Sequence, residues 1–164
     1  MAAWRPMSED DIGGVMRVAD MVHPDLPERD CVFTERVKLF PEGCLVLVEG
    51  QEVCGYAISH PICEGQPPEL DSLLEEMATD ASQYYIHDIA ILPRFRGQGL
   101  AAECVNKLLN VANHYPTTCL ISVYGTTAFW GHFGFIAEPV DASLSEKLRH
   151  YGQDAIFLTR RNRP

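Results

Sequence analysis

Apolar residues in this chain recur at two spacings, and the changes from one spacing to the other predict helices alternating with short strands. Between residues 12 and 22, apolar positions return every three or four residues behind Ser8, a good N-cap, and an acidic first turn. Around Gly50-Gln51, two apolar runs flank a two-residue turn, which is typical of a β-hairpin. The pattern predicts strands over residues 2–7, 44–49, 52–59, 84–92, 117–124 and 154–159. It predicts helices over residues 8–22, 28–40, 70–77, 100–109 and 126–133, with an amphipathic segment over 141–151.

These elements predict a single α+β domain over residues 1–164, because no repeat, low-complexity block or linker interrupts them. A chain of this length can bury a core without disulfides or metal. Residues 60–82 are rich in proline and glycine, and long irregular segments of this kind are either functional lids or mobile loops.

The stretch YYIHDIAILPRFRGQGLAAECVNKLL, residues 84–109, carries the clearest chemical signal. It predicts a strand, an arginine- and glycine-rich turn over residues 93–99, and an amphipathic helix. Glycines let a ligand approach the backbone, and the first helical N–H groups are unpaired donors with a partial positive charge behind them. We therefore expect this turn to hold phosphate.

The net charge of −10 narrows the choice of partners. A protein that binds duplex nucleic acid or an anionic membrane needs a basic face, so we expect neither partner. The same acidity would attract cationic small molecules, although solubility alone also accounts for it.

The six cysteines lie singly, most of them in apolar runs and without a CxxC pair, which is typical of buried reduced thiols in a cytosolic protein. The first residues lack the basic start and apolar run of a signal peptide, and the sequence has no apolar stretch long enough to span a membrane. We therefore expect a cytoplasmic protein.

Two interpretations fit the glycine turn. In the first, Gly97, Gly99 and Ala102 form a dinucleotide-binding fingerprint, whose third position accepts alanine. Such a unit places an acidic residue at the end of the next strand to bind ribose. Here that strand ends in Ser122-Val123-Tyr124, and a hairpin precedes the turn in place of a βαβ array. A dinucleotide-dependent oxidoreductase is therefore the less favoured interpretation.

The second interpretation rests on Arg96-x-x-Gly99-x-Ala101, which lies between an apolar strand end and a helix. It resembles the acyl-CoA motif of the GNAT acyltransferase superfamily, Gln/Arg-x-x-Gly-x-Gly/Ala. The segment AFWGHFGF, residues 128–135, resembles the C-terminal signature of the same family. The order of predicted elements matches that family from about residue 2 to residue 159. The two motifs at this separation are more specific than either motif alone.

The resemblance implies a GNAT fold, with helices around a twisted, mixed and mostly antiparallel sheet, and acetyl-CoA as acyl donor. It implies that the pantetheine arm pairs with the end of the central strand like an added strand. The pyrophosphate would lie on the turn and the helix start, where Arg96 and Arg94 could add charge or belong to a solvated turn. The residues implied for donor binding are Ile89, Ala90, Ile91, Arg96, Gly97, Gln98, Gly99, Leu100, Ala101 and Ala102.

Acyl transfer to an amine needs a neutral nitrogen, and an alkylamine of pKa about 10.4 is mostly protonated near pH 7. A general base relieves part of this penalty, and His87 on the central strand is our candidate because imidazole titrates near neutrality. Strand alternation places Tyr85 and His87 on one face and Asp88 on the other. His87 and Tyr85 are similar in position to a histidine pair of arylalkylamine N-acetyltransferases, so the first histidine of that pair is replaced here. The alternative is that His87 is a hydrogen-bonded core residue.

The family usually has a tyrosine in its C-terminal signature that protonates the leaving thiolate, and Trp130 stands at that position here. An indole is not a useful acid near neutral pH. Tyr124 is the best substitute, and solvent can also protonate a thiolate. The histidines and cysteines show no metal-ligand spacing and no GxSxG elbow is present, so we expect neither a metal site nor a hydrolase.

The resemblance therefore predicts an N-acetyltransferase that moves acetyl from acetyl-CoA to a primary amine, either a small amine or a peptide or protein amine. The alternative is a CoA-binding regulatory module that keeps the fold without turnover. Residues 23–33 and 60–82 are expected to form the acceptor wall, where acids such as Asp25, Glu28 and Asp30 could hold an ammonium group or form a solvated face. The resemblance also allows a homodimer.

Overall fold

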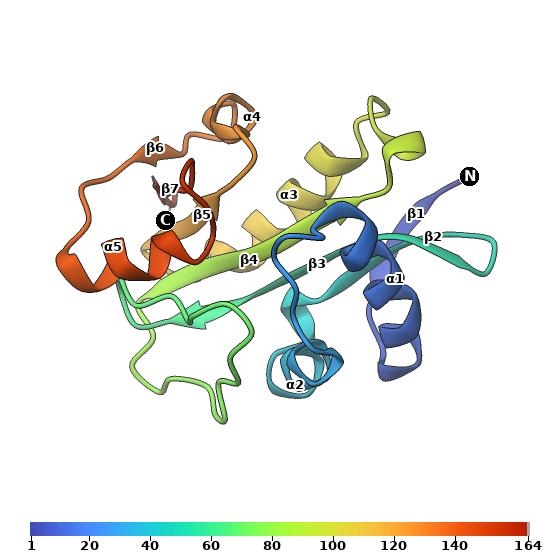
Figure 1. The fold of residues 1–164 in the computed structure, drawn as a ribbon, viewed down its shortest axis with the longest axis horizontal. Helices are drawn as coiled ribbons and strands as arrows, with labels where there is room; N and C mark the ends of the chain where they lie inside the picture. Colours follow the sequence, from blue (N-terminus) through green and yellow to red (C-terminus); the bar gives the residue numbers. More distant parts are fainter. Residues whose placement is uncertain (164) are drawn as a thin grey trace.

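The computed structural model describes residues 1–163, which form a seven-stranded sheet flanked by helices (Figure 1). The strands are β1 (Ala3–Pro6), β2 (Leu45–Glu49), β3 (Glu52–Ile62), β4 (Gln83–Ile91), β5 (Thr117–Ser122), β6 (Ile136–Ala137) and β7 (Ile156–Arg161). The helices are α1 (Ile12–Val22), α2 (Asp30–Leu39), α3 (Leu100–Ala112), α4 (Thr127–Gly131) and α5 (Ala142–Arg149), with 3₁₀ turns at Glu9–Asp11, Pro41–Gly43 and Pro93–Phe95. The predicted α+β class is confirmed.

The sheet is mixed and mostly antiparallel, in the order β1-β2-β3-β4-β5-β7-β6. Within the described residues, β4 and β5 form the one parallel pair. This arrangement excludes the βαβαβ array of a dinucleotide-binding unit, whose strands run parallel.

One predicted helix is wrong. Residues 70–77 form an irregular segment, and two of them, Asp71 and Glu75, have positive φ angles of 58° and 69°. The cause is tertiary: the carboxylate of Glu35 on α2 accepts the backbone N–H groups of Leu74 and Glu75 at 2.6 and 3.0 Å. These bonds hold the segment against α2 in a conformation that is not helical.

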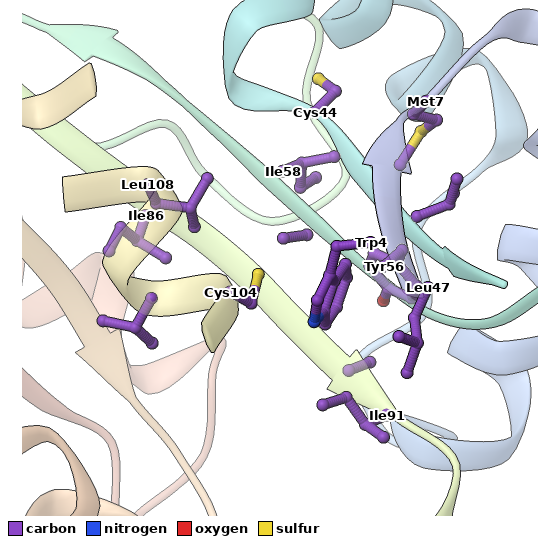
Figure 2. Packing of buried hydrophobic residues seen from close by; sticks show 14 of the residues in the cluster. Trp4, Met7, Cys44, Leu47, Tyr56, Ile58, Ile86, Ile91, Cys104 and Leu108 are labelled. Atoms are coloured by element: carbon purple, nitrogen blue, oxygen red, sulfur yellow. The ribbon is translucent and has the colours of Figure 1, made fainter. Parts of the chain in front are cut away.

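The helices lie on both faces of the sheet. In Figure 1, α1 crosses in front of the band formed by β3 and β4, α2 lies below it and α3 lies above it. The buried core extends through the sheet, and Figure 2 shows Cys104 and Leu108 of α3 close to Ile86 of β4. Both faces of β4 are therefore covered along much of its length.

Trp4 fixes the start of α3 to the far edge of the sheet. Its indole N–H donates to the carbonyl of Leu100 at 2.9 Å, across 96 residues of sequence. The ring is buried in the core, where Figure 2 shows it beside the central strands. The first turn of α3, which follows the glycine turn, is thus held in place from β1.

The helices of the described chain are short compared with a membrane-spanning helix. Across residues 1–163, we find no helix that combines the length and apolar character needed to cross a bilayer.

Candidate active site

A cleft opens where β4 and β5 separate. Their parallel pairing covers four residue pairs, from Gln83–Thr117 to Ile86–Leu120. Beyond Ile86, β4 pairs with β3 but with no other strand of the described chain. The resulting cleft has a volume of about 740 Å³ and is bounded by β4, β5, the glycine turn, the start of α3 and α4. Its floor is a strand edge with free backbone groups.

The glycine turn closes one end of this cleft. Gly97 and Gly99 have φ angles of 79° and 76°, in the left-handed region that glycine adopts without strain. A Cβ on either residue would meet no described atom within 4 Å, so the space beside the turn is open. The first N–H groups of α3 have no partner within a helix and point out of its N-terminus. This end of the cleft suits a diphosphate.

Nine of the ten residues predicted for donor binding line the cleft, and Gln98 does not. Arg96 lines it and donates through Nε to the carbonyl of Ile91 at 3.2 Å. Arg94 instead pairs with Glu52 on the outer surface and lies over the ring of Phe95. Of the two arginines, Arg96 is therefore the one placed to meet a phosphate in the cleft.

The other end of the cleft holds two histidine–carboxylate pairs. In the first pair, Nε2 of His87 lies 2.8 Å from Oε1 of Glu28, and the two side chains are 1% and 4% exposed. The second oxygen of Glu28 accepts the backbone N–H of Asp71 at 2.9 Å. Burial alone would raise the pKa of Glu28, but the contacts with His87, with smaller contributions from Asp71 and Arg36, outweigh it and lower the pKa. His87 is therefore an anchored residue of the cleft wall.

The second pair joins His23, at the end of α1, to Asp88. Nε2 of His23 lies 2.8 Å from Oδ1 of Asp88, and Oδ2 of Asp88 accepts the hydroxyl of Tyr56. Burial lowers the pKa of His23, but the charge and hydrogen bond of Asp88, together with the charge of Glu28, outweigh it and the net shift is upward. Sequence reasoning placed residue 23 in the acceptor wall without giving it a chemical role.

The alternation predicted for β4 is wrong at His87. The ladder with β3 passes from Ile58–Asp88 to Ser59–Ile86, so His87 is an extra residue in a β-bulge. His87 and Asp88 consequently both reach the loop between α1 and α2, at Glu28 and His23. Asp88, expected on the opposite face, is a member of the site.

Tyr85 does not line the cleft. It is completely buried, and its ring contacts the rings of His60 and His87 at centroid distances of 5.6 and 5.4 Å. Burial raises the pKa of Tyr85 far above its ordinary range and lowers that of His60 to about 3. Both side chains are therefore neutral near pH 7 and form the packing behind His87.

Tyr124 and Trp130 occupy the β5 side of the cleft. Tyr124 has a φ of 56° and is 48% exposed, and its ring stacks on His23 at 5.5 Å with the planes 7° apart. Trp130 is buried between Phe129 and Phe135. Trp130 thus forms part of the cleft wall. Tyr124 is the more exposed of the two side chains, and it carries a hydroxyl.

Within residues 1–163, no group of three or more histidine, cysteine, aspartate or glutamate side chains is arranged to hold a metal ion. The polar groups of the cleft are the histidines, carboxylates, tyrosine and arginine described above.

The sequence matches the model of the acetyltransferase (GNAT) family over residues 14–135. Among curated proteins, no significant match is found. Three solved structures show the same fold at low identity. The GphF GNAT-like decarboxylase in complex with isobutyryl-CoA has a TM-score of 0.78 and 11% identity, over 98% of this chain and 100% of that chain. Naa20 of Chaetomium thermophilum in complex with a bisubstrate analogue has a TM-score of 0.71 and 14% identity, over 98% and 86%.

The ribosomal-protein-S18-alanine N-acetyltransferase of Escherichia coli has a TM-score of 0.67 and 13% identity, over 100% of this chain and 96% of that chain. Identities this low carry the fold alone, whereas the family model covers most of the chain and includes the glycine turn and the segment 128–135. The chain belongs to the GNAT acetyltransferase family.

Proposed function

We propose that this protein transfers the acetyl group of acetyl-CoA to a primary amine. The observation that carries the proposal is the free edge of β4 between a phosphate-type turn and two histidine–carboxylate pairs. An extended pantetheine arm would pair with Ile89 to Ile91, as a peptide does in strand addition. The diphosphate would lie on Gly97 to Ala102, and the thioester would then lie beside His87 and Asp88.

The histidines supply what amine acylation needs. An alkylamine with a pKa near 10.4 is neutral in only about one molecule in a thousand near pH 7, a penalty of about 4 kcal/mol. A base at the thioester reduces this penalty. His87 is the base expected from the sequence, and the structure adds His23 beside it.

Charge supports a cationic acceptor. Burial raises the pKa of Tyr124, and the carboxylates of Asp25, Asp88 and Asp154 raise it further. Three acids from three segments therefore act on the mouth of the cleft near Tyr124. Naa20 with its bisubstrate analogue and the S18-alanine N-acetyltransferase, which share this fold, are consistent with an amine acceptor.

The test is binding and turnover with the purified protein. Calorimetry with acetyl-CoA should show one site, and replacing Arg96 with alanine should weaken binding, whereas Arg94→Ala should change it little. Release of free CoA thiol would then be followed with polyamines, arylalkylamines and peptides with free N-termini. Absence of acetyl-CoA binding by the wild-type protein would contradict the proposal at its first step.

The alternative function, a CoA-binding module without turnover, is favoured by Trp130 at the position where the family usually has a tyrosine. The fold also serves other chemistry, since GphF is a GNAT-like decarboxylase. Acetyl-CoA binding without acetylation of any amine in the panel would favour the module over the enzyme.

A further inference from the structure

The pair formed by His23 and Asp88 is part of a longer chain of hydrogen bonds that ends in the cleft. The hydroxyl of Tyr56 donates to Oδ2 of Asp88, and Oδ1 of Asp88 accepts from Nε2 of His23. Tyr56 is completely buried, so the carboxylate is held from below by a group that has no access to solvent. The chain therefore orders the imidazole of His23 from the protein interior outward.

These hydrogen bonds determine which nitrogen of His23 can accept a proton. An ionised carboxylate only accepts hydrogen bonds, so the contact with Asp88 places the proton of neutral His23 on Nε2. Nδ1 then carries the lone pair. It is buried in the cleft wall and has no hydrogen-bond partner among residues 1–163. A buried ring nitrogen without a partner is uncommon, and an N–H of an acceptor or of a bridging water would satisfy it.

His87 has the same arrangement of contacts at its two ring nitrogens as His23, but its environment is different. Its Nδ1 is also buried without a partner in the described chain, and its Nε2 also meets a carboxylate. The His87 and Glu28 side chains are only 1% and 4% exposed, whereas those of His23 and Asp88 are 11% and 15% exposed. Glu28 also uses its second oxygen to hold the backbone of Asp71. The Glu28–His87 pair holds the loops against the sheet, and the His23–Asp88 pair lies nearer the open cleft.

Tyr124 adds a second reason to favour His23. The two rings are stacked in parallel with centroids 5.5 Å apart, so the imidazole that follows α1 and the phenol ring on the β5 side face each other. A base and an acid on neighbouring rings suit a reaction in which an amine loses a proton and a thiolate gains one.

We propose that His23 is the general base of the acetyl transfer and that Asp88 is the residue that positions it; this rests on the function proposed above. Nδ1 of His23 takes a proton from the acceptor ammonium, and the free amine attacks the thioester carbonyl carbon. The carbon–sulfur bond breaks and the CoA thiolate takes a proton from Tyr124 or water, and that group regains a proton from the second N–H of the nitrogen as the amide forms. His23 then returns its proton to solvent.

The charges around His23 set the direction of its pH dependence. Asp88 on β4 and Glu28 in the loop after α1 raise its pKa, Arg96 in the turn after β4 lowers it, and Tyr124 stacks on the ring. Burial opposes the carboxylates without cancelling them, so the pKa of His23 lies above its ordinary value of 6.5. Activity should therefore fall on acidification through a pH above 6.5, where His23 becomes protonated.

The experiment measures kcat/KM for the best amine of the panel between pH 5 and 9.5, in the wild type and in H23Q, H87Q and D88N. H114Q, on the surface beyond α3, is the matched histidine control. We expect H23Q to lower kcat/KM tens-fold or more. The fall in kcat/KM on acidification, the acidic limb of the pH profile, should disappear in this variant. H87Q should keep that limb, D88N should move it to lower pH, and H114Q should match the wild type. Calorimetry should show that H23Q binds acetyl-CoA within about threefold of the wild type.

A wild-type acidic limb in H23Q, or its loss in H87Q and not in H23Q, would overturn the assignment. If H23Q does not fold, the position of the limb in D88N decides: an unshifted limb refutes the role of His23. Failure of the proposed function is separate, because a wild-type protein that acetylates no amine would show it before any variant is made.

Discussion

Glu28 and His87 lie 59 residues apart in the sequence and form a hydrogen-bonded pair of 2.8 Å that is almost completely buried. Glu28 belongs to the loop after α1, and His87 is the extra residue of the bulge in β4. Because the second oxygen of Glu28 holds the backbone of Asp71, one carboxylate joins β4 to both loops expected to face the acceptor.

Removing this carboxylate should destabilise the protein strongly. Truncating Glu28 leaves the buried Nε2 of His87 and the backbone N–H of Asp71 without their acceptor, so Glu28→Ala should lower the free energy of unfolding by about 3 kcal/mol. Urea denaturation at pH 7 measures it. Arg29→Ala is the matched control, since its pair with Asp71 lies in the same loops but is 60% and 36% exposed. It should cost much less than Glu28→Ala, because solvent screens an exposed pair. Equal losses in the two variants would contradict this account.

Buried His60 should make the protein sensitive to acid. Burial lowers its pKa to about 3, against an ordinary value of 6.5, so the unfolded chain binds a proton that the folded chain refuses between these values. Stability is thus complete above pH 6.5 and falls as the pH drops toward 3. Between pH 7 and 5, this group should account for a loss of about 2 kcal/mol. His60→Gln should lose less stability than the wild type over that interval in urea denaturation, and parallel losses would refute the assignment.

The left-handed glycine at the start of α3 should matter for both stability and donor binding. Gly99→Ala places a side chain at a φ of 76°, at a cost of about 1 kcal/mol, and a methyl group in the space proposed for the diphosphate. We expect a loss of acetyl-CoA affinity of tenfold or more by calorimetry. Gly13→Ala, inside α1 where a Cβ meets no described atom within 4 Å, should instead stabilise the protein by about 1 kcal/mol. Its affinity should be unchanged.

The hydroxyl of Tyr124 should contribute to protonation of the leaving thiolate. Its pKa is raised by burial and by nearby carboxylates, so it keeps its proton near pH 7. Tyr124→Phe keeps the stacking on His23 and removes the hydroxyl. We expect kcat to fall several-fold to tens-fold at constant affinity for acetyl-CoA, measured by thiol release. Trp130→Phe, which changes the wall, should alter affinity more than kcat, and an unchanged kcat in Tyr124→Phe would leave protonation to solvent.

The parts of the site that depend on residues adjacent in the sequence could be predicted from the sequence. The strand, glycine turn and helix of residues 84–109 are encoded by local composition, and nine of ten residues expected in the donor site line the cleft. His87 was identified by its position on that strand.

The contacts that define the acceptor end could not be predicted in the same way. The pairs His23–Asp88 and Glu28–His87 join residues 65 and 59 positions apart, and no spacing rule signals them. The bulge at His87 depends on pairing with β3, so strand alternation alone misplaced Asp88. The irregular form of residues 70–77 depends on Glu35, which lies on another element.

The separation of β4 from β5 has a consequence for aggregation. Unpaired backbone groups on a strand edge invite association with strands of other molecules, and this protein keeps such an edge inside a cleft. The protection depends on α3, α4 and β5 staying in place, so partial opening of the C-terminal half would expose β4 to other chains. A ligand that pairs with this edge would act as a cap on it, and we expect acyl donors to slow the formation of heat-induced aggregates as well as to raise the melting temperature.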